Sequence, residues 1–154
     1  MKNRDGGDYE GKKWDVYVYG DVNIDLVVPG VSSLPKPGQE DEVPVMDTYV
    51  VGGAALFALG IGKLGLHPVF QGEVGDDCYG ELIRKEFAAK NIDDSLLGTS
   101  RTEKTGISIS FTNEKDRSFL TYRGTNAGIS IDKVDIEGVK NASFRRGNAV
   151  KLDF

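Results

Sequence analysis

An acid and an amide lie two residues apart, directly after the first predicted strand. The strand is WDVYVY at residues 14–19, and GDVNID at residues 20–25 follows it. Asn23 and Asp25 alternate onto one side of the chain, and ligands of open α/β sheets collect at the carboxyl ends of strands. A carboxylate accepts hydrogen bonds while an amide both donates and accepts, as recognition of vicinal hydroxyls requires. A solvated turn has the same pattern, so position alone leaves both interpretations open.

A pair of glycines marks a second candidate site. Gly52 and Gly53 lie between a strand predicted at residues 42–51 and a helix predicted from residue 53. Free backbone N–H groups and the positive dipole end at a helix start favour a polar or anionic ligand. Two glycines can equally make a tight strand-to-helix turn without any ligand, and both interpretations stay open.

A third glycine pattern, GIGKLG at residues 60–65, matches the G-x-G-x-x-G spacing of dinucleotide-binding turns. That motif must follow a strand directly and open a helix. Here residues 54–59 precede the glycines with helical apolar spacing, so the glycines fall late in a helix. We therefore interpret them as small residues that let the helix pack closely on the sheet, with Gly65 ending the helix.

The elements that position these residues follow from periodicity and turn signals. Helical spacing predicts helices at residues 53–64 and after Asp76 or Asp77, either of which can cap the second helix. The strand–helix–strand order over residues 42–74 predicts an α/β sheet with crossover helices. Residues 105–123 read as a hairpin, which does not fit that alternation and is expected in a small accessory sheet.

Composition narrows the class of ligand. The 154 residues suggest one domain, and the net charge of −5 argues against a nucleic-acid partner. No apolar run approaches the roughly 18 residues of a membrane helix, so no membrane partner is expected. The single cysteine, Cys78, excludes an internal disulfide and a cysteine-based zinc site, and it suits a cytoplasmic location.

Five motifs in order resemble the N-terminal part of the PfkB/ribokinase family of carbohydrate kinases, over about residues 14–142. They are GDVNID at 20–25, the glycine signature at 52–75, VGDDCYG at 74–80, the Thr105-Gly106 pair that opens a lid strand, and YRGTNA at 122–127.

The resemblance implies an α/β fold, the N-terminal part of a ribokinase-like (Rossmann-like) three-layer domain with a small β-sheet lid. The lid strands would lie at about 43–50, 105–112 and 118–123, and the lid often mediates dimerisation in this family. The activity implied is ATP-dependent phosphorylation of a hydroxyl on a sugar, sugar acid or nucleoside. ATP and Mg²⁺ are the cofactors expected of the full-length family, but no site for them is recognisable in this sequence.

Site residues carry over by position. The resemblance assigns substrate binding to Asn23 and Asp25, with the backbone of Gly52 and Gly53 close to the sugar. Strand alternation from Gly106 adds Ser108 and Ser110 as weaker candidates. Arg123 could clamp a substrate carboxylate or phosphate, or could simply be a surface charge. No catalytic residue and no metal ligand is identified.

The sequence departs from the family pattern in two places. Leu56 stands where the family signature has an asparagine, which removes one polar contact. Residues 143–154 (SFRRGNAVKLDF) show no strand-like core run where a new apolar strand is expected. We therefore expect a disordered tail at 1–13, a substrate half at 14–142 and a divergent tail at 143–154.

Three hypotheses follow from that ending. The chain could be a truncated or frame-shifted copy of a sugar kinase, which translation of the downstream DNA in the other frames would test. It could be a non-catalytic sugar-binding or lid-mediated interaction module. It could also be an enzyme completed by a partner chain that supplies the ATP half.

Overall fold

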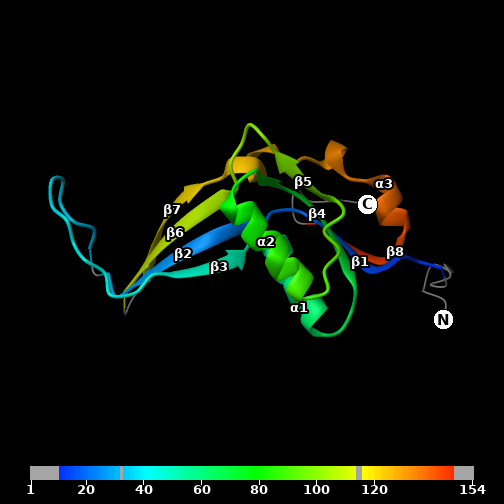
Figure 1. Cartoon of the computed structure of the whole chain (residues 1–154), viewed down its shortest axis with the longest axis horizontal. Helices are drawn as coiled ribbons and strands as arrows, with labels where there is room; N and C mark the ends of the chain where they lie inside the picture. The colour runs from blue at the N-terminus through cyan, green and yellow to red at the C-terminus, as the bar shows by residue number, and fades with distance from the viewer. Residues whose placement is uncertain (1–10, 32, 114–115, 148–154) are drawn as a thin grey trace.

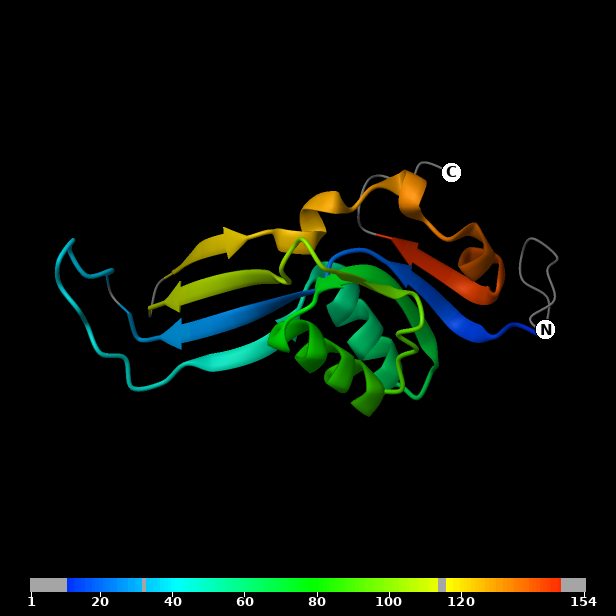
Figure 2. The same cartoon turned by 45° about the horizontal axis from the view of Figure 1, so that its top comes forward.

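Strand β1 (Trp14–Tyr19) lies inside an α/β body and leads directly into a second, four-stranded sheet that we call the lid. The computed structural model describes residues 11–31, 33–113 and 116–147 (Figure 1). Within these ranges the lid extends away from the body along the long axis of the molecule (Figure 2). None of the helices described has the length and apolar character that a membrane crossing requires.

The body is built on a fully parallel sheet with the strand order β5-β4-β1-β8. Its other strands are β4 (Pro68–Gly75), β5 (Leu97–Ser100) and β8 (Ala142–Gly147). Most positions of β1 are buried, as expected of a parallel strand covered on both faces.

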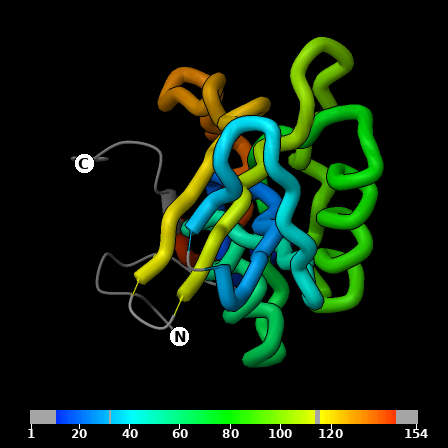
Figure 3. Tube along the Cα trace, turned by 90° about the vertical axis from the view of Figure 1, so that its left-hand side faces the viewer, coloured from blue at the N-terminus to red at the C-terminus, as the bar shows by residue number. Residues whose placement is uncertain are grey.

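Helices cover both faces of this sheet. Helices α1 (Gly53–Lys63) and α2 (Cys78–Ala89) lie on one face, and the short elements η2 (Ile131–Lys133) and α3 (Ile136–Lys140) lie on the other (Figure 3). The short helix η1 (Gly124–Gly128) contacts both β4 and the lid, so it sits where the two parts meet.

Two hydrophobic cores flank the body sheet, and β1 contributes side chains to both. Val16 and Val18 point toward α1 and α2, where Phe70 and Phe87 meet edge to face with ring centroids 5.0 Å apart. The core on the opposite face contains Trp14, Tyr17, Tyr19, Val69 and Ala142. The body is thus the three-layer α/β arrangement that the sequence predicts.

The lid has the strand order β3-β2-β6-β7. Its strands are β2 (Asn23–Pro29), β3 (Asp47–Val51), β6 (Gly106–Thr112) and β7 (Arg117–Tyr122). The β2–β3 and β6–β7 pairs are antiparallel, whereas β2 and β6 run parallel. The predicted hairpin therefore does belong to an accessory sheet, and β2 is a central strand that the predicted lid omitted.

The predicted crossover unit over residues 42–74 is wrong, because its two strands belong to different sheets. β3 pairs with β2 in the lid, and β4 pairs with β1 in the body. The parallel crossover is instead β4–α2–β5. β3 also begins at Asp47, so only the second half of the strand predicted at 42–51 is strand.

The segment after residue 142 does form a strand, contrary to expectation. β8 pairs in parallel with β1, from Trp14 opposite Ala142 to Tyr19 opposite Gly147. An edge strand needs no continuous apolar run, and Phe144 is exposed here. Residues 148–154, like residues 1–10 of the predicted N-terminal tail, lie outside the described part of the chain. Lys13 belongs to the body, since its backbone N–H donates to the Asn141 carbonyl at 3.0 Å.

The glycine run at residues 60–65 lies at the end of α1, as predicted. Gly65 has φ of +84° just after the helix, which is the left-handed conformation typical of a helix end. Gly62 packs so closely on the Lys90 carbonyl at the end of α2 that it leaves no room for a side chain. The small residue therefore serves helix packing, but against α2 rather than against the sheet.

Candidate functional site

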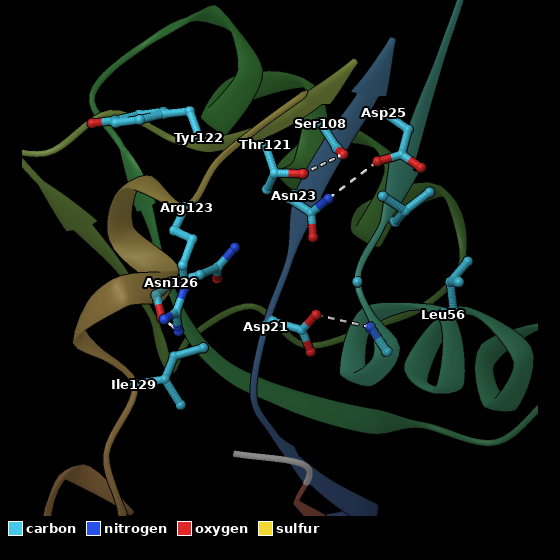
Figure 4. Close-up of a pocket in the computed structure, with 13 residues that line it drawn as sticks. Asp21, Asn23, Asp25, Leu56, Ser108, Thr121, Tyr122, Arg123, Asn126 and Ile129 are labelled. Atoms are coloured by element: carbon cyan, nitrogen blue, oxygen red, sulfur yellow. Dashed lines mark hydrogen bonds between the residues drawn. The ribbon is translucent and has the colours of Figure 1, made fainter. Parts of the chain in front are cut away.

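A cavity of about 580 Å³ lies at the junction of the lid and the body (Figure 4). This volume falls within the roughly 300–1,000 Å³ usual for small-molecule sites. The cavity is lined by Asp21, Asn23, Asp25, Val51, Gly52, Gly53, Leu56, Ser108, Thr121, Tyr122, Arg123, Asn126 and Ile129. Six of the seven residues that the sequence suggested are among them, and the exception is Ser110.

Strand β2 brings Asn23 and Asp25 to the same face, as alternation predicts. Asn23 Nδ2 donates to Asp25 Oδ1 at 3.3 Å, and both side chains border the cavity. Burial raises the pKa of Asp25, and the positive charge of Arg117 partly opposes this shift. The pair offers a carboxylate and an amide with remaining capacity for ligand hydroxyls.

Ser108 on β6 continues the polar surface toward β7. Its hydroxyl lies 2.9 Å from that of Thr121, so the two form a hydrogen bond beside Asp25. Ser110 shares the face of Ser108 but lies further out on the lid, where it is 4% exposed and does not line the cavity.

The backbone N–H groups at the start of α1 are not free, contrary to the basis on which Gly52 and Gly53 were predicted. The Asp21 carboxylate accepts hydrogen bonds from Gly53 N at 3.0 Å and from Ala54 N at 3.1 Å. Its backbone carbonyl accepts from Ala55 N at 3.2 Å. An acid that follows β1 thus caps the helix and complements its dipole.

Gly52 is needed for a close approach of backbone to backbone. Its φ is +113°, and a Cβ atom at this position would lie 2.5 Å from the Asp21 carbonyl oxygen. The glycine pair therefore makes room for the segment between β1 and β2. Gly52 and Gly53 still border the cavity, but the neighbour that requires the Gly52 glycine is protein backbone.

Asn126 and Arg123 close the cavity on the side of η1. Asn126 is buried, and its side chain bonds to both backbone groups of Val22. Arg123 is exposed and donates from Nη2 to the Asn126 carbonyl at 3.3 Å, which keeps its guanidinium at the rim. A substrate carboxylate or phosphate at this rim would meet a positive charge.

Sequence reasoning missed Asp21, Thr121, Tyr122, Asn126, Val51 and Ile129 as parts of the site. Asp21 lies in the GDVNID element, but the helix start that it caps is more than 30 positions away, so no local signal reveals its role. Thr121 could have been found, because an antiparallel partner of Ser108 in the predicted hairpin must lie on the same face.

The described part of the chain contains no cluster of three or more His, Cys, Asp or Glu residues that could hold a metal ion. The glycine run that resembles a nucleotide motif lies at the far end of α1 from the cavity. None of the cavity residues is therefore assigned to Mg²⁺ or ATP.

Comparison with known proteins relates this chain to sugar kinases. A curated 5-dehydro-2-deoxygluconokinase of Clostridium perfringens is 29% identical over 131 residues, which cover 83% of this chain and 37% of the relative. The probable fructokinase-3 of Arabidopsis thaliana is 25% identical over 148 residues, covering 92% and 41%. The chain spans less than half the length of these relatives.

The fold comparison agrees. The structure of Arabidopsis thaliana ribokinase complexed with ribose and ATP matches with a TM-score of 0.77 and 25% identity, over 87% of this chain and 45% of the other. This confirms a partial ribokinase-like domain. The model of the pfkB family carbohydrate kinases matches residues 13–149, so the resemblance extends through β8. The chain belongs to the pfkB family of carbohydrate kinases.

Proposed function

We propose that this chain binds a sugar, sugar acid or nucleoside in the cavity between lid and body, as the substrate-binding part of a carbohydrate kinase. The observation that carries the proposal is the Asn23–Asp25 pair, which borders a cavity of small-ligand size beside the Ser108–Thr121 hydroxyl pair. Carboxylate, amide and hydroxyl groups on one continuous surface complement the alternating donors and acceptors of a polyol. The named activities of the relatives, on a deoxygluconate derivative and on fructose, fit the same chemistry.

The reaction proposed for the whole protein is transfer of the γ-phosphate of ATP to a substrate hydroxyl, with Mg²⁺ neutralising the phosphates. Such a transfer also needs a group that accepts the hydroxyl proton. Asp21 already accepts two amide hydrogen bonds, and Asp25 is bonded to Asn23. We infer that the base lies outside this cavity surface and that the surface itself binds and orients the substrate.

Binding is tested with the chain as it is. We expect D-ribose, D-fructose, D-gluconate or adenosine to raise the melting temperature without ATP, because a ligand that binds only the folded state stabilises it. Asp25→Asn should weaken the affinity measured by calorimetry about tenfold or more, and Asp132→Asn, an exposed change on η2, should not. A panel in which no compound stabilises the chain would overturn the proposal.

A non-catalytic sugar-binding module is the second candidate. It is favoured because both acids of the cavity, Asp21 and Asp25, already accept hydrogen bonds from the protein. The two candidates differ in one measurement, the release of ADP from Mg·ATP in the presence of the bound sugar. Release by this chain alone would exclude the second candidate. Sugar binding without release would support it, and release that appears only on mixing with a second polypeptide would indicate a kinase completed in trans.

We also propose a homodimer through the lid and a cytoplasmic location. Phe119 on β7 and Tyr49 on β3 are exposed apolar residues, and the strand register places both on the same face of the lid. Exposed apolar surface of this kind marks interaction sites. Phe119→Asp should shift a dimer toward monomer in analytical ultracentrifugation, whereas Leu64→Asp, at an exposed leucine after α1, should not. A wild-type chain that sediments as a monomer at all concentrations would contradict the dimer.

A further inference from the structure

We infer that Leu56 selects a substrate that presents a carbon without a hydroxyl group to α1, that is, a deoxy sugar or deoxy sugar acid. This inference rests on the proposed sugar binding and specifies the substrate class for the same cavity. The two walls of the cavity differ in polarity.

Leu56 is exposed on α1, as is its neighbour Phe57, which is 36% exposed but does not border the cavity. In the same stretch of α1 the small residues Ala54, Ala55 and Ala58 are almost fully buried and form the contact with the core. Leu56 is 54% exposed and borders the cavity. The first turns of the helix thus direct small residues to the core and a large apolar side chain to the ligand site, while Leu59 and Ile61 pack against the core further along the helix.

The polar side chains that border the cavity come from elements other than α1. Asn23, Asp25, Ser108 and Thr121 come from β2, β6 and β7, and Asn126 comes from η1. Figure 4 shows Leu56 on the α1 side, opposite Arg123, Asn126 and Ile129. The second apolar residue of the α1 side is Val51, the last residue of β3. A sugar in this cavity has hydrogen-bond partners on the β2 side, whereas the α1 side presents the hydrocarbon of Leu56 and Val51 next to the Asp21 carboxylate, which is bonded to the helix amides.

The backbone of α1 cannot replace the missing polar side chain. The amides of Gly53 and Ala54 bond to the Asp21 carboxylate, and the amide of Ala55 bonds to the Asp21 carbonyl. The amide of Leu56 itself bonds to the Gly52 carbonyl at 2.8 Å. All four amide donors of the first turn are therefore in use, and a ligand hydroxyl facing this turn would find no donor.

Selectivity follows from this lack of partners. A hydroxyl pressed against Leu56 would lose hydrogen bonds to water and gain none from the leucine side chain or from the amides of this turn, whereas a methylene or methyl group would bury apolar surface favourably. Differences of one such group in an apolar pocket change affinity or specificity by about 10- to 200-fold. We therefore expect at least a tenfold preference for the matching deoxy compound.

The experiment is a deoxy scan by calorimetry on the wild-type chain. The probes are D-glucose with its 2-deoxy, 3-deoxy and 6-deoxy analogues, and the pairs D-ribose with 2-deoxy-D-ribose and D-gluconate with 2-deoxy-D-gluconate. At least one deoxy compound should bind at least about tenfold tighter than its parent. In Leu56→Asn, whose side chain has a similar branched shape but donates and accepts hydrogen bonds, that ratio should fall to near one or invert.

Leu64→Asn is the matched control, because Leu64 is 79% exposed at the other end of the same helix and does not border the cavity. It should keep the wild-type ratio. If sugars bind but the Leu56→Asn ratio equals that of wild type, Leu56 is no specificity residue, while the proposed sugar binding stands. Parents that bind tighter than every deoxy analogue in the wild-type chain would overturn the inference in the same way. Absence of any binding would overturn both proposals together.

Discussion

The Asn126 side chain holds both backbone polar groups of Val22. Its Oδ1 accepts from Val22 N at 3.2 Å, and its Nδ2 donates to the Val22 carbonyl at 2.9 Å. The two bonds fix η1, at the end of the lid hairpin, to the segment that passes from body to lid. One wall of the cavity therefore depends on a single amide side chain that is 9% exposed.

Removal of this amide should destabilise the fold. Asn126→Ala leaves the buried N–H and carbonyl of Val22 without their side-chain partner, and an unsatisfied buried group costs about 1–3 kcal/mol. Urea denaturation should show a lower free energy of unfolding by about this amount. Asn141→Ala, at an exposed residue whose side chain donates only to the Glu137 carbonyl, should change stability by less than about 0.5 kcal/mol. Equal losses in the two variants would contradict the role given to Asn126.

Gly52 should tolerate no side chain. Gly52→Ala combines a φ of +113° with a Cβ atom 2.5 Å from the Asp21 carbonyl oxygen, and backbone strain alone costs on the order of 1–3 kcal/mol. We expect a clear fall in melting temperature by circular dichroism. Gly60→Ala provides the contrast, because this helix position has open space around it and the change should stabilise the chain by about 0.5–1 kcal/mol. A Gly52→Ala variant as stable as wild type would show that the segment after β1 can move away.

Asp77 should make stability depend on pH at the acid end. Burial raises the pKa of Asp77, but hydrogen bonds from the amides of Thr105 and Gly80 and from the Thr105 hydroxyl outweigh it, so the pKa lies below 3.8. A carboxyl whose pKa is lower in the folded state adds stability above its unfolded pKa, and loses it as the pH falls through the folded value. Unfolding free energies measured from pH 6 to pH 2 should therefore converge for wild type and Asp77→Asn at low pH. Asp76→Asn, an exposed neighbour, should follow the wild-type curve; parallel curves for Asp77→Asn would contradict the prediction.

Asp25 should set the acid limit of sugar binding. Burial raises its pKa above 3.8, so protonation begins at a higher pH than for an ordinary aspartate and removes an ionised acceptor from the cavity. Affinity should therefore decline with falling pH from above pH 3.8, even as protonation relieves the cost of a buried charge in the unliganded fold. Arg117→Gln removes the charge that opposes the shift, and should move the decline to higher pH. A pH profile of affinity identical in wild type and Asp25→Asn would rule out this acceptor role.

The sequence predicts where strands and helices lie better than it predicts which strands pair with one another. β1, β4 and α2 carry strong local signals, and of the two caps that the sequence offered for α2, Asp76 and Asp77, the structure uses Asp77. The order of the elements placed β3 in the body sheet, whereas the family resemblance placed residues 43–50 in the lid, where β3 does lie. Order alone could not decide, because a strand's sheet depends on hydrogen-bond partners elsewhere in the chain. β8 was not predicted because it is an edge strand with Phe144 exposed, and it lacks the apolar run of a central strand.

The same limit applies to the cavity. Asn23 and Asp25 could be placed because a strand puts alternate residues on one face. The true occupant of the α1 start, the Asp21 carboxylate, could not be found, because the sequence pattern of a helix start is the same whether its amides face a ligand or a distant acid. Gly52 and Gly53 border the cavity, but the free amides on which their prediction was based are bonded to Asp21.

The wide separation of the cavity residues along the chain has a kinetic consequence. Residues 21–25 face residues 121–129, so the cavity exists only after a loop of about one hundred residues has closed, a slow and entropically costly event. Units that are local in sequence, such as β4–α2–β5, can form earlier, but they have no affinity for a sugar. In refolding from denaturant, recovery of ligand binding should thus lag behind recovery of helical circular dichroism, and a bound sugar should slow unfolding more than it speeds folding.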